Sequence, residues 1–162
     1  MTSWRARLRL TVPVGLASFM LAVAGALTPA SAATDWYFVS GYLGSCLKAP
    51  SGYSPYVGDC SGSSHSWHWG SESNTWDGHT MRRLVNNQTG DCLTTDDAYD
   101  YNSVWMAPCG GGRSGQFWTA DGSFIQNQNH NYLAADDDGS LYSELVSGNV
   151  IPDRFAWSDY RF

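Results

Sequence analysis

The sequence predicts an all-β fold built from a repeated unit. Short runs rich in aromatic and β-branched residues, such as WYFV at residues 36–39 and MRRLV at residues 81–85, are bounded by Gly, Asn, Asp and Ser. After residue 32, no long stretch shows the 3.6-residue apolar period of an amphipathic helix. Similar segments also recur along the chain. Together these observations indicate many short strands joined by tight turns.

The first 32 residues have the pattern of a secretory signal peptide. Three arginines precede an apolar run at residues 12–27, and the small residues Ala30, Ser31 and Ala32 follow it as a cleavage signature. An uncleaved membrane anchor is the alternative, but no stop-transfer flank follows the apolar run. We therefore expect cleavage after Ala32 or one residue later, and a secreted, extracellular domain that spans residues 33–162.

The domain expected after cleavage is strongly acidic. It contains all fifteen Asp and Glu residues of the chain but only six of its Lys and Arg residues, which gives a formal net charge of −9. A negative surface repels the phosphates of nucleic acids and anionic lipid headgroups. The charge therefore argues against nucleic acid as a partner and against membrane insertion, and it favours solubility.

Four cysteines in an exported chain predict two disulfides. Three pairings are possible, and the sequential one, Cys46 with Cys60 and Cys92 with Cys109, closes short local loops of 15 and 18 residues. On the loop-entropy model each bridge would contribute about 3 kcal/mol to stability. A zinc site is the rival interpretation, but the chain contains no CxxC motif, which argues against zinc.

Two segments share the same order of features. Residues 45–69 (SCLKAPSGYSPYVGDCSGSSHSWHW) and 91–118 (DCLTTDDAYDYNSVWMAPCGGGRSGQFW) each contain Cys-Leu, a polar loop, a second Cys, a Gly/Ser turn and then a Trp. A weaker third copy at residues 131–157 opens with Tyr132-Leu133, ends with Phe155-Ala156-Trp157 and lacks cysteines. The copies begin 46 and 40 residues apart, a period typical of a repeated supersecondary unit that shares one core.

Residues 92–125, CLTTDDAYDYNSVWMAPCGGGRSGQFWTADGSFI, resemble one repeat of the ricin B-type lectins. The likeness lies in the Cys-Leu opening, the second Cys, the Gln-x-Trp close and the Asp-Gly turn that follows. It extends over residues 33–162, with repeats at roughly 36–80, 81–122 and 123–162. The resemblance implies a β-trefoil, in which three pseudo-repeats form a six-stranded barrel with three hairpins over one end.

In this family the Gln-x-Trp segment belongs to the core. The resemblance implies that Trp67, Trp118 and Trp157 pack near the pseudo-threefold axis, and that Gln116 satisfies neighbouring backbone groups. His65 stands at the Gln position of the first repeat and Phe155 at that of the third. Because Phe cannot make an amide's hydrogen bonds, we expect those groups to be satisfied otherwise, for example by water, and the third repeat to be the least regular.

Sugar binding in the family uses other positions, which this chain does not retain. A competent repeat has an Asp two residues after the first Cys, an aromatic residue two before the second Cys, and often an Asn before Gln-x-Trp. A pocket without acceptors and a stacking face has little with which to discriminate sugars, so we do not expect galactose binding at the usual positions. In repeat order, the Asp position carries Lys48, Thr94 and Ala134, the aromatic position Gly58, Ala107 and Ser147, and the Asn position Ser64, Gly115 and Arg154.

A different sugar site is the hypothesis that remains. Glycan recognition combines fixed polar groups such as carboxylates with aromatic faces, and the loop at residues 96–105 is rich in both. We predict a ligand site there, formed by Asp97, Asp100, Tyr101, Asn102 and Trp105. The alternative is that these aromatic residues belong to the core or cap the barrel.

No motif indicates catalysis or a metal site. The acidic run at residues 136–140 lacks the spacing and the distal Glu of a calcium loop, and neither G-x-S-x-G nor H-E-x-x-H occurs. The sequence therefore predicts a protein that is not an enzyme and uses no metal or cofactor. Two hypotheses remain: a secreted module that binds a glycan or polysaccharide, and a protein-binding trefoil, either an inhibitor or a subunit of a secreted assembly, that has lost sugar binding.

Overall fold

The computed structural model describes residues 34–112, 114–147 and 152–162. The predicted signal peptide lies outside the described residues. Among those that are described, no helix is long and apolar enough to cross a membrane.

Twelve strands and two short 3₁₀ helices make up the described chain. The strands are β1 (Asp35–Ser40), β2 (Cys46–Lys48), β3 (Tyr56–Gly58), β4 (Trp67–Trp76), β5 (His79–Asn86), β6 (Cys92–Thr95), β7 (Tyr101–Ala107), β8 (Phe117–Thr119), β9 (Gln126–Asn127), β10 (Tyr132–Ala135), β11 (Leu141–Glu144) and β12 (Trp157–Arg161). The helices are η1 (Ser114–Gln116) and η2 (Asp153–Phe155).

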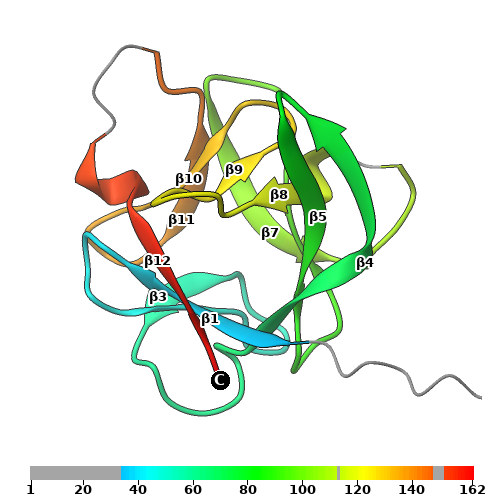
Figure 1. Cartoon of the computed structure of the whole chain (residues 1–162). Helices are drawn as coiled ribbons and strands as arrows, with labels where there is room; N and C mark the ends of the chain where they lie inside the picture. Colours follow the sequence, from blue (N-terminus) through cyan, green and yellow to red (C-terminus); the bar gives the residue numbers. More distant parts are fainter. Residues whose placement is uncertain (1–33, 113, 148–151) are drawn as a thin grey trace, which may run out of the picture. The chain divides into compact units, whose positions relative to one another are not determined.

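The strands repeat a four-strand unit three times. The first and last strands of each unit belong to a barrel, in which β12, β1, β4, β5, β8 and β9 pair antiparallel in that order. A bridge between Phe124 and Ala156 joins the two ends of this series. The middle strands form the hairpins β2–β3, β6–β7 and β10–β11, and β7 also pairs with β11. Figure 1 shows the barrel strands arranged around a common axis.

One tryptophan of each unit is anchored in the core by the same contact. Trp67, Trp118 and Trp157 are buried, and each indole Nε1–H donates to the carbonyl of a buried leucine two residues into the preceding hairpin. Paired polar atoms remove the cost of burying the indole nitrogen, so the rings can fill the barrel interior. The donor–acceptor distances are 3.0 Å to Leu47, 2.8 Å to Leu93 and 2.9 Å to Leu133.

The turn that leads from each barrel strand into its hairpin is also repeated. Asn86 and Asn127 are fully buried, and the side-chain oxygen of each accepts two hydrogen bonds from backbone N–H groups that follow it. Ser40 holds the same place in the first unit and accepts from the backbone N–H of Leu43. A short side chain that bonds the backbone just ahead of it specifies a tight turn.

The two disulfides join Cys46 to Cys60 and Cys92 to Cys109, the pairing that the sequence favours. Each closes one hairpin region of the first and second units. The third unit has no bridge and instead has a small separate core of Ala134, Tyr142 and Phe155, against which Phe124, Tyr132 and Val146 pack.

The Gln position of the three units is used in three ways. Gln116 accepts from the backbone N–H of Gly110, and its amide nitrogen donates to the Pro108 carbonyl and to Thr94 Oγ1, all at 3.1 Å. His65 is buried, and its Nδ1 finds no partner among the described residues. Phe155 instead packs edge-on against Tyr142, with ring centres 5.9 Å apart. An apolar cluster, rather than a substitute hydrogen bond, therefore occupies this place in the third unit.

Candidate functional site

The sugar-binding positions implied by the resemblance are filled with protein atoms in the first two units. In the first, Lys48 is buried and pairs with Asp59 at 2.8 Å, while a Cβ added to Gly58 would lie 2.7 Å from the ring of Tyr56. In the second, a Cβ at Gly115 would lie 1.9 Å from the carbonyl oxygen of Thr95. No side chain fits there, because η1 packs directly on β6.

In the third unit, the Asp position of the family is blocked in a different way. Ala134 is completely buried in the small core with Tyr142 and Phe155. Ala134 carries no hydrogen-bond acceptor and is covered by this cluster, so the position offers a sugar neither a polar group nor open space.

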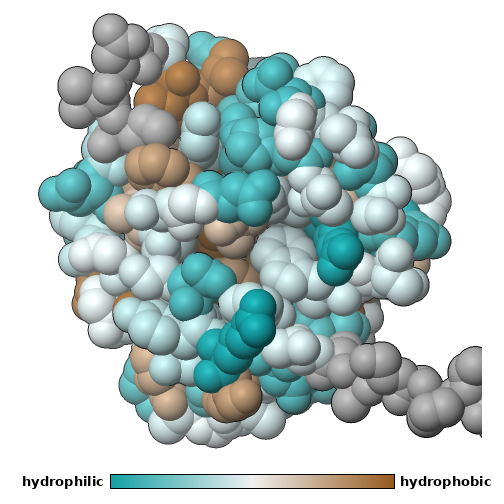
Figure 2. Space-filling view, viewed as in Figure 1, coloured by the Kyte–Doolittle hydropathy of each residue, from teal (hydrophilic) through white to brown (hydrophobic). Residues whose placement is uncertain are grey.

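A pocket of about 280 Å³ opens at one end of the barrel, and we call it the barrel-mouth pocket. Its residues come from the beginnings of β1 and β5, from the first half of β4, from the end of β8 and the residues after it, and from β12. The hairpins follow the opposite ends of β1 and β5, so the pocket lies at the barrel end away from them. Figure 2 shows hydrophobic residues within this face and hydrophilic residues around them. The pocket is lined by Trp36, Trp69, Thr80, Arg82, Trp118, Thr119, Ala120, Asp121 and Asp159.

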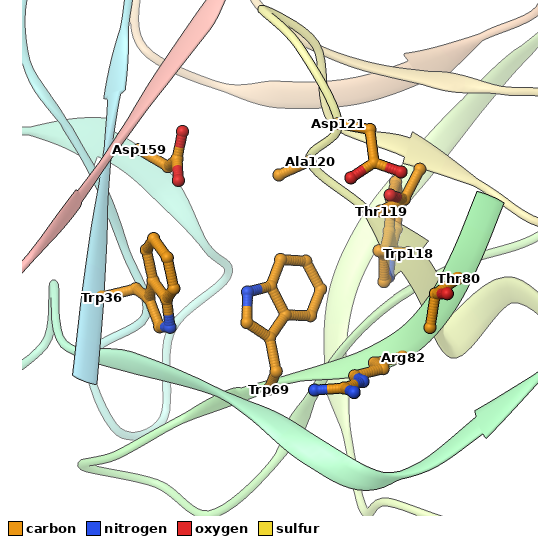
Figure 3. A pocket seen from close by; sticks show the side chains of 9 residues that line it. All are labelled: Trp36, Trp69, Thr80, Arg82, Trp118, Thr119, Ala120, Asp121 and Asp159. Atoms are coloured by element: carbon orange, nitrogen blue, oxygen red, sulfur yellow. The ribbon is translucent and has the colours of Figure 1, made fainter. Parts of the chain in front are cut away.

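Two indole rings line the barrel-mouth pocket, with Trp36 at one side and Trp69 in the middle (Figure 3). Trp36 and Trp69 are half-buried. The ring of Trp69 is held against Phe38 in an edge-on contact, with centres 6.0 Å apart, and the Arg161 guanidinium lies 4.6 Å from the centre of the Trp36 ring. Strand alternation places both indoles inward, because Trp36 is two residues from the buried Phe38 and Trp69 two from the buried Trp67. The rings are therefore fixed faces rather than mobile surface side chains.

Two carboxylates lie on the same pocket. His79 Nδ1 is 2.9 Å from Asp121 Oδ2, and this hydrogen bond holds the pKa of the Asp121 carboxyl below its usual value. Asp159 makes no side-chain hydrogen bond within residues 34–112, 114–147 and 152–162. In Figure 3, Asp159 lies beside Trp36, and Asp121 lies across the pocket beside Thr119. Both carboxylates are exposed, so both offer oxygen acceptors to a ligand.

Comparisons with known proteins agree with this architecture. No family model and no curated protein matches the chain. Among solved structures, the earthworm R-type lectin C-half in complex with GalNAc has a TM-score of 0.58 at 10% identity, over 80% of this chain and 99% of that one. BEL β-trefoil has a TM-score of 0.58 at 12% identity, over 83% and 96%. This chain is a β-trefoil. The fold thus agrees with what the resemblance to ricin B-type repeats implies.

A third similar structure belongs to a much longer protein. The GlcNAcα1-4Gal-releasing endo-β-galactosidase from Clostridium perfringens has a TM-score of 0.60 at 16% identity, over 80% of this trefoil. The trefoil spans about a third of that enzyme, since the match covers 32% of its chain.

The five residues that the sequence nominated do not line the barrel-mouth pocket of the trefoil. Asp97 and Asp100 are exposed on the loop before β7, and Trp105 is half-buried on β7. Asn102 is buried, and both atoms of its amide bond the backbone of Tyr99 at 2.6 and 2.9 Å. This asparagine holds the loop in shape.

Tyr101, the fifth nominated residue, belongs to a cluster that links all three units. Its hydroxyl donates to Asp136 Oδ2 at 3.1 Å, and its ring stacks on Tyr142 with centres 4.3 Å apart. Burial, followed by the adjacent Asp136, raises the pKa of Tyr101 to about 12. Asp136 also accepts from Arg154 at 3.0 Å, and Tyr42 of the first unit donates to Asp137. The polar atoms of this cluster satisfy one another, which indicates a structural contact between the units.

Alternation along the last strand is the sequence signal that could have identified the pocket. In β12, WSDYR, the odd positions Trp157, Asp159 and Arg161 point inward, although barrel interiors are normally apolar. Charges at inward positions of a short strand therefore mark the mouth of the barrel, where inward side chains reach solvent.

Proposed function

We propose that this trefoil is a secreted, non-catalytic carbohydrate-binding module, and that one sugar unit binds in the barrel-mouth pocket. The observation that carries the proposal is the meeting of two fixed indoles and two exposed carboxylates on one pocket. Sugars present a C–H face that stacks on aromatic rings and hydroxyl groups that donate to carboxylates. A site with both elements can replace the water that the sugar loses.

The size of the pocket supports a small ligand portion. A pocket of about 280 Å³ is at the lower end of the range of roughly 300–1,000 Å³ typical of ligand sites. One pyranose ring of a longer glycan fits this description, with its apolar face on Trp69 and its hydroxyls toward Asp159 and Asp121. The rest of the glycan would extend into solvent.

Two similar structures support sugars as the ligand class. The earthworm lectin half was solved in complex with GalNAc, and the enzyme from Clostridium perfringens is an endo-β-galactosidase that releases GlcNAcα1-4Gal. The proposed site is a non-standard one, because the three positions implied by the family resemblance are filled with protein atoms.

The electrostatics of Asp121 argue against a role for this carboxyl as the acid in glycoside hydrolysis. Glycoside hydrolysis by two carboxyl groups requires one of them to act as a general acid, with a raised pKa. The hydrogen bond from His79 lowers the pKa of Asp121. This carboxylate is therefore suited to accept hydrogen bonds from hydroxyl groups and poorly suited to protonate a leaving group.

The test is glycan binding by the protein produced from the full sequence, using a broad glycan array with insoluble chitin, cellulose and xylan. Trp69→Ala should abolish saturable binding, because it removes the central stacking face. Trp76→Ala is the matched control, since Trp76 is on the hairpin tip and outside the pocket. Asp97→Ala and Trp105→Ala test the loop site predicted from sequence. Loss of binding in these loop variants, with Trp69→Ala unaffected, would refute the barrel-mouth site in favour of the loop.

Exposed tyrosines favour a protein partner as a second candidate function. Tyr53 and Tyr99 are 75% and 78% exposed, on the loops that join the two strands of the hairpins β2–β3 and β6–β7. Protein interfaces are enriched in tyrosine, which supplies contact area at low entropy cost. Co-purification from the culture supernatant should then recover a stoichiometric partner that is lost in Tyr53→Ser, Tyr99→Ser. Repeated recovery of the chain alone would count against this candidate.

A further inference from the structure

The mouth of the barrel carries inward charges where the layer below it is apolar. Arg82 faces inward, because it is paired across the sheet with the buried Trp118. By contrast, the next residue, Arg83, points to the outer face of the barrel. Its neighbour across the sheet is Phe117, and its guanidinium lies over the Phe117 ring. Two residues deeper on the same strand, Leu84 is fully buried in the core. The change from leucine to arginine marks the boundary between the packed interior and the pocket.

The two inward arginines at the mouth are not neutralised by the protein. Four ion pairs occur in the described part of the chain, and neither Arg82 nor Arg161 takes part in any of them. Arg161 and Trp36 are directly opposite each other on neighbouring strands, and the Arg161 guanidinium lies over the Trp36 ring. Asp121 bonds His79 at 2.9 Å, and Asp159 takes part in none of the four ion pairs. Among the residues that line the barrel-mouth pocket, Arg82 is the one arginine, and it has no ion-pair partner in the described residues.

Arg82 and the carboxylate of Asp159 lie on different sides of the barrel-mouth pocket. Figure 3 shows Arg82, Thr80, Thr119 and Asp121 on one side, Asp159 with Trp36 on the other, and the indole of Trp69 between them. A guanidinium presents a planar fork of N–H donors that matches a carboxylate in a bidentate pair. The hydroxyl groups of the two threonines add donors on the same side.

We infer that the barrel-mouth pocket selects a pyranose that carries a carboxylate, such as a uronic acid, and that Arg82 is the residue that determines this specificity. The inference rests on the proposed function. The carboxylate of the sugar pairs with Arg82, the ring stacks on Trp69, and a hydroxyl on the far side donates to Asp159. The net charge of −9 for residues 33–162 repels an acidic sugar, but mainly at long range, and salt screens this repulsion beyond about 8 Å under physiological conditions. The pair with Arg82 forms in direct contact, where this screening is weak.

The experiment compares ligands that differ only in charge. Glucuronate and galacturonate oligosaccharides and their methyl esters have nearly the same shape, and calorimetry gives the affinity of each for the full-length product. The wild type should bind the acids about ten- to a hundredfold more tightly than the esters, because a hydrogen bond to a charged group is stronger than one to a neutral group. Arg82→Gln should reduce this ratio to about one, and Arg82→Lys should leave an intermediate ratio, since it keeps the charge but loses the fork. Arg154→Gln, which lies outside the pocket, should retain the wild-type ratio.

Two outcomes separate the inference from the function on which it rests. If the esters bind as well as the acids while Trp69→Ala still weakens both, the acidic specificity is wrong and the sugar site stands. If neither acids, esters nor neutral glycans bind the wild type, both proposals are overturned. The acid-to-ester ratio of the wild type decides the inference even where Arg82→Gln does not fold.

Discussion

Replacing Trp118 with Phe tests whether the repeated indole contact holds the barrel together. The substitution removes the Nε1–H that donates to the Leu93 carbonyl at 2.8 Å and leaves space where the larger ring was completely buried. The lost hydrogen bond is expected to cost about 1 kcal/mol. The lost burial should add about 1–2 kcal/mol, by comparison with other large-to-small changes in cores. The free energy of unfolding should therefore fall by about 2–3 kcal/mol.

Urea denaturation of the wild type and the variant, monitored by tryptophan fluorescence and circular dichroism, measures this loss. Trp157→Phe provides an internal comparison, because its indole makes the same contact with Leu133 at 2.9 Å and should show a similar loss. Trp76→Phe is the control, since Trp76 is 37% exposed and should change stability by less than about 0.5 kcal/mol. If Trp118→Phe costs no more than Trp76→Phe, the indole contacts do not stabilise the barrel and the reasoning is wrong.

Three further predictions concern the disulfides, the closed sugar position and the pocket carboxylate. Removing the second bridge with Cys92→Ala, Cys109→Ala should lower the free energy of unfolding by about 3 kcal/mol, and an unchanged denaturation midpoint would contradict this. Gly115→Asn restores the family's residue but places a Cβ against the Thr95 carbonyl, so it should destabilise by about 3 kcal/mol and fail to create a sugar site. Its thermal melt and glycan binding test both parts. The lowered pKa of Asp121 makes a contribution to stability that is present above the unfolded pKa of about 4 and is lost as the pH falls through the lower folded pKa. Thermal melts across this acidic range should show a smaller loss in His79→Ala than in the wild type, and equal losses would exclude the His79 contact as the cause.

Local sequence patterns determined the fold class and the repeated unit. Alternating short strands, turn residues and the cysteine spacing act over tens of residues at most, so they can be recognised without knowing the tertiary structure. The all-β class and the resemblance to ricin B-type repeats came from such patterns, and the trefoil neighbours agree with both. The apolar cluster at the Gln position of the third repeat was harder to predict. Phe155 signalled a lost amide, but the aromatic cluster with Tyr142 depends on strands that meet only in the folded chain.

The site predicted from the sequence and the site proposed from the structure are different, and the loop site stays a prediction. The loop at residues 96–105 stood out because its acids and aromatic rings are adjacent in sequence, yet Asn102 is used to hold that loop. The barrel-mouth pocket takes its residues from five separate strands or strand ends, with Trp36 and Asp159 at nearly opposite ends of the described chain. Only sheet register brings them together, since a shift of one residue would turn Arg82 outward and Arg83 inward. The sequence by itself thus determined what the chain folds into, and the closure of the barrel decided which side chains line the barrel-mouth pocket.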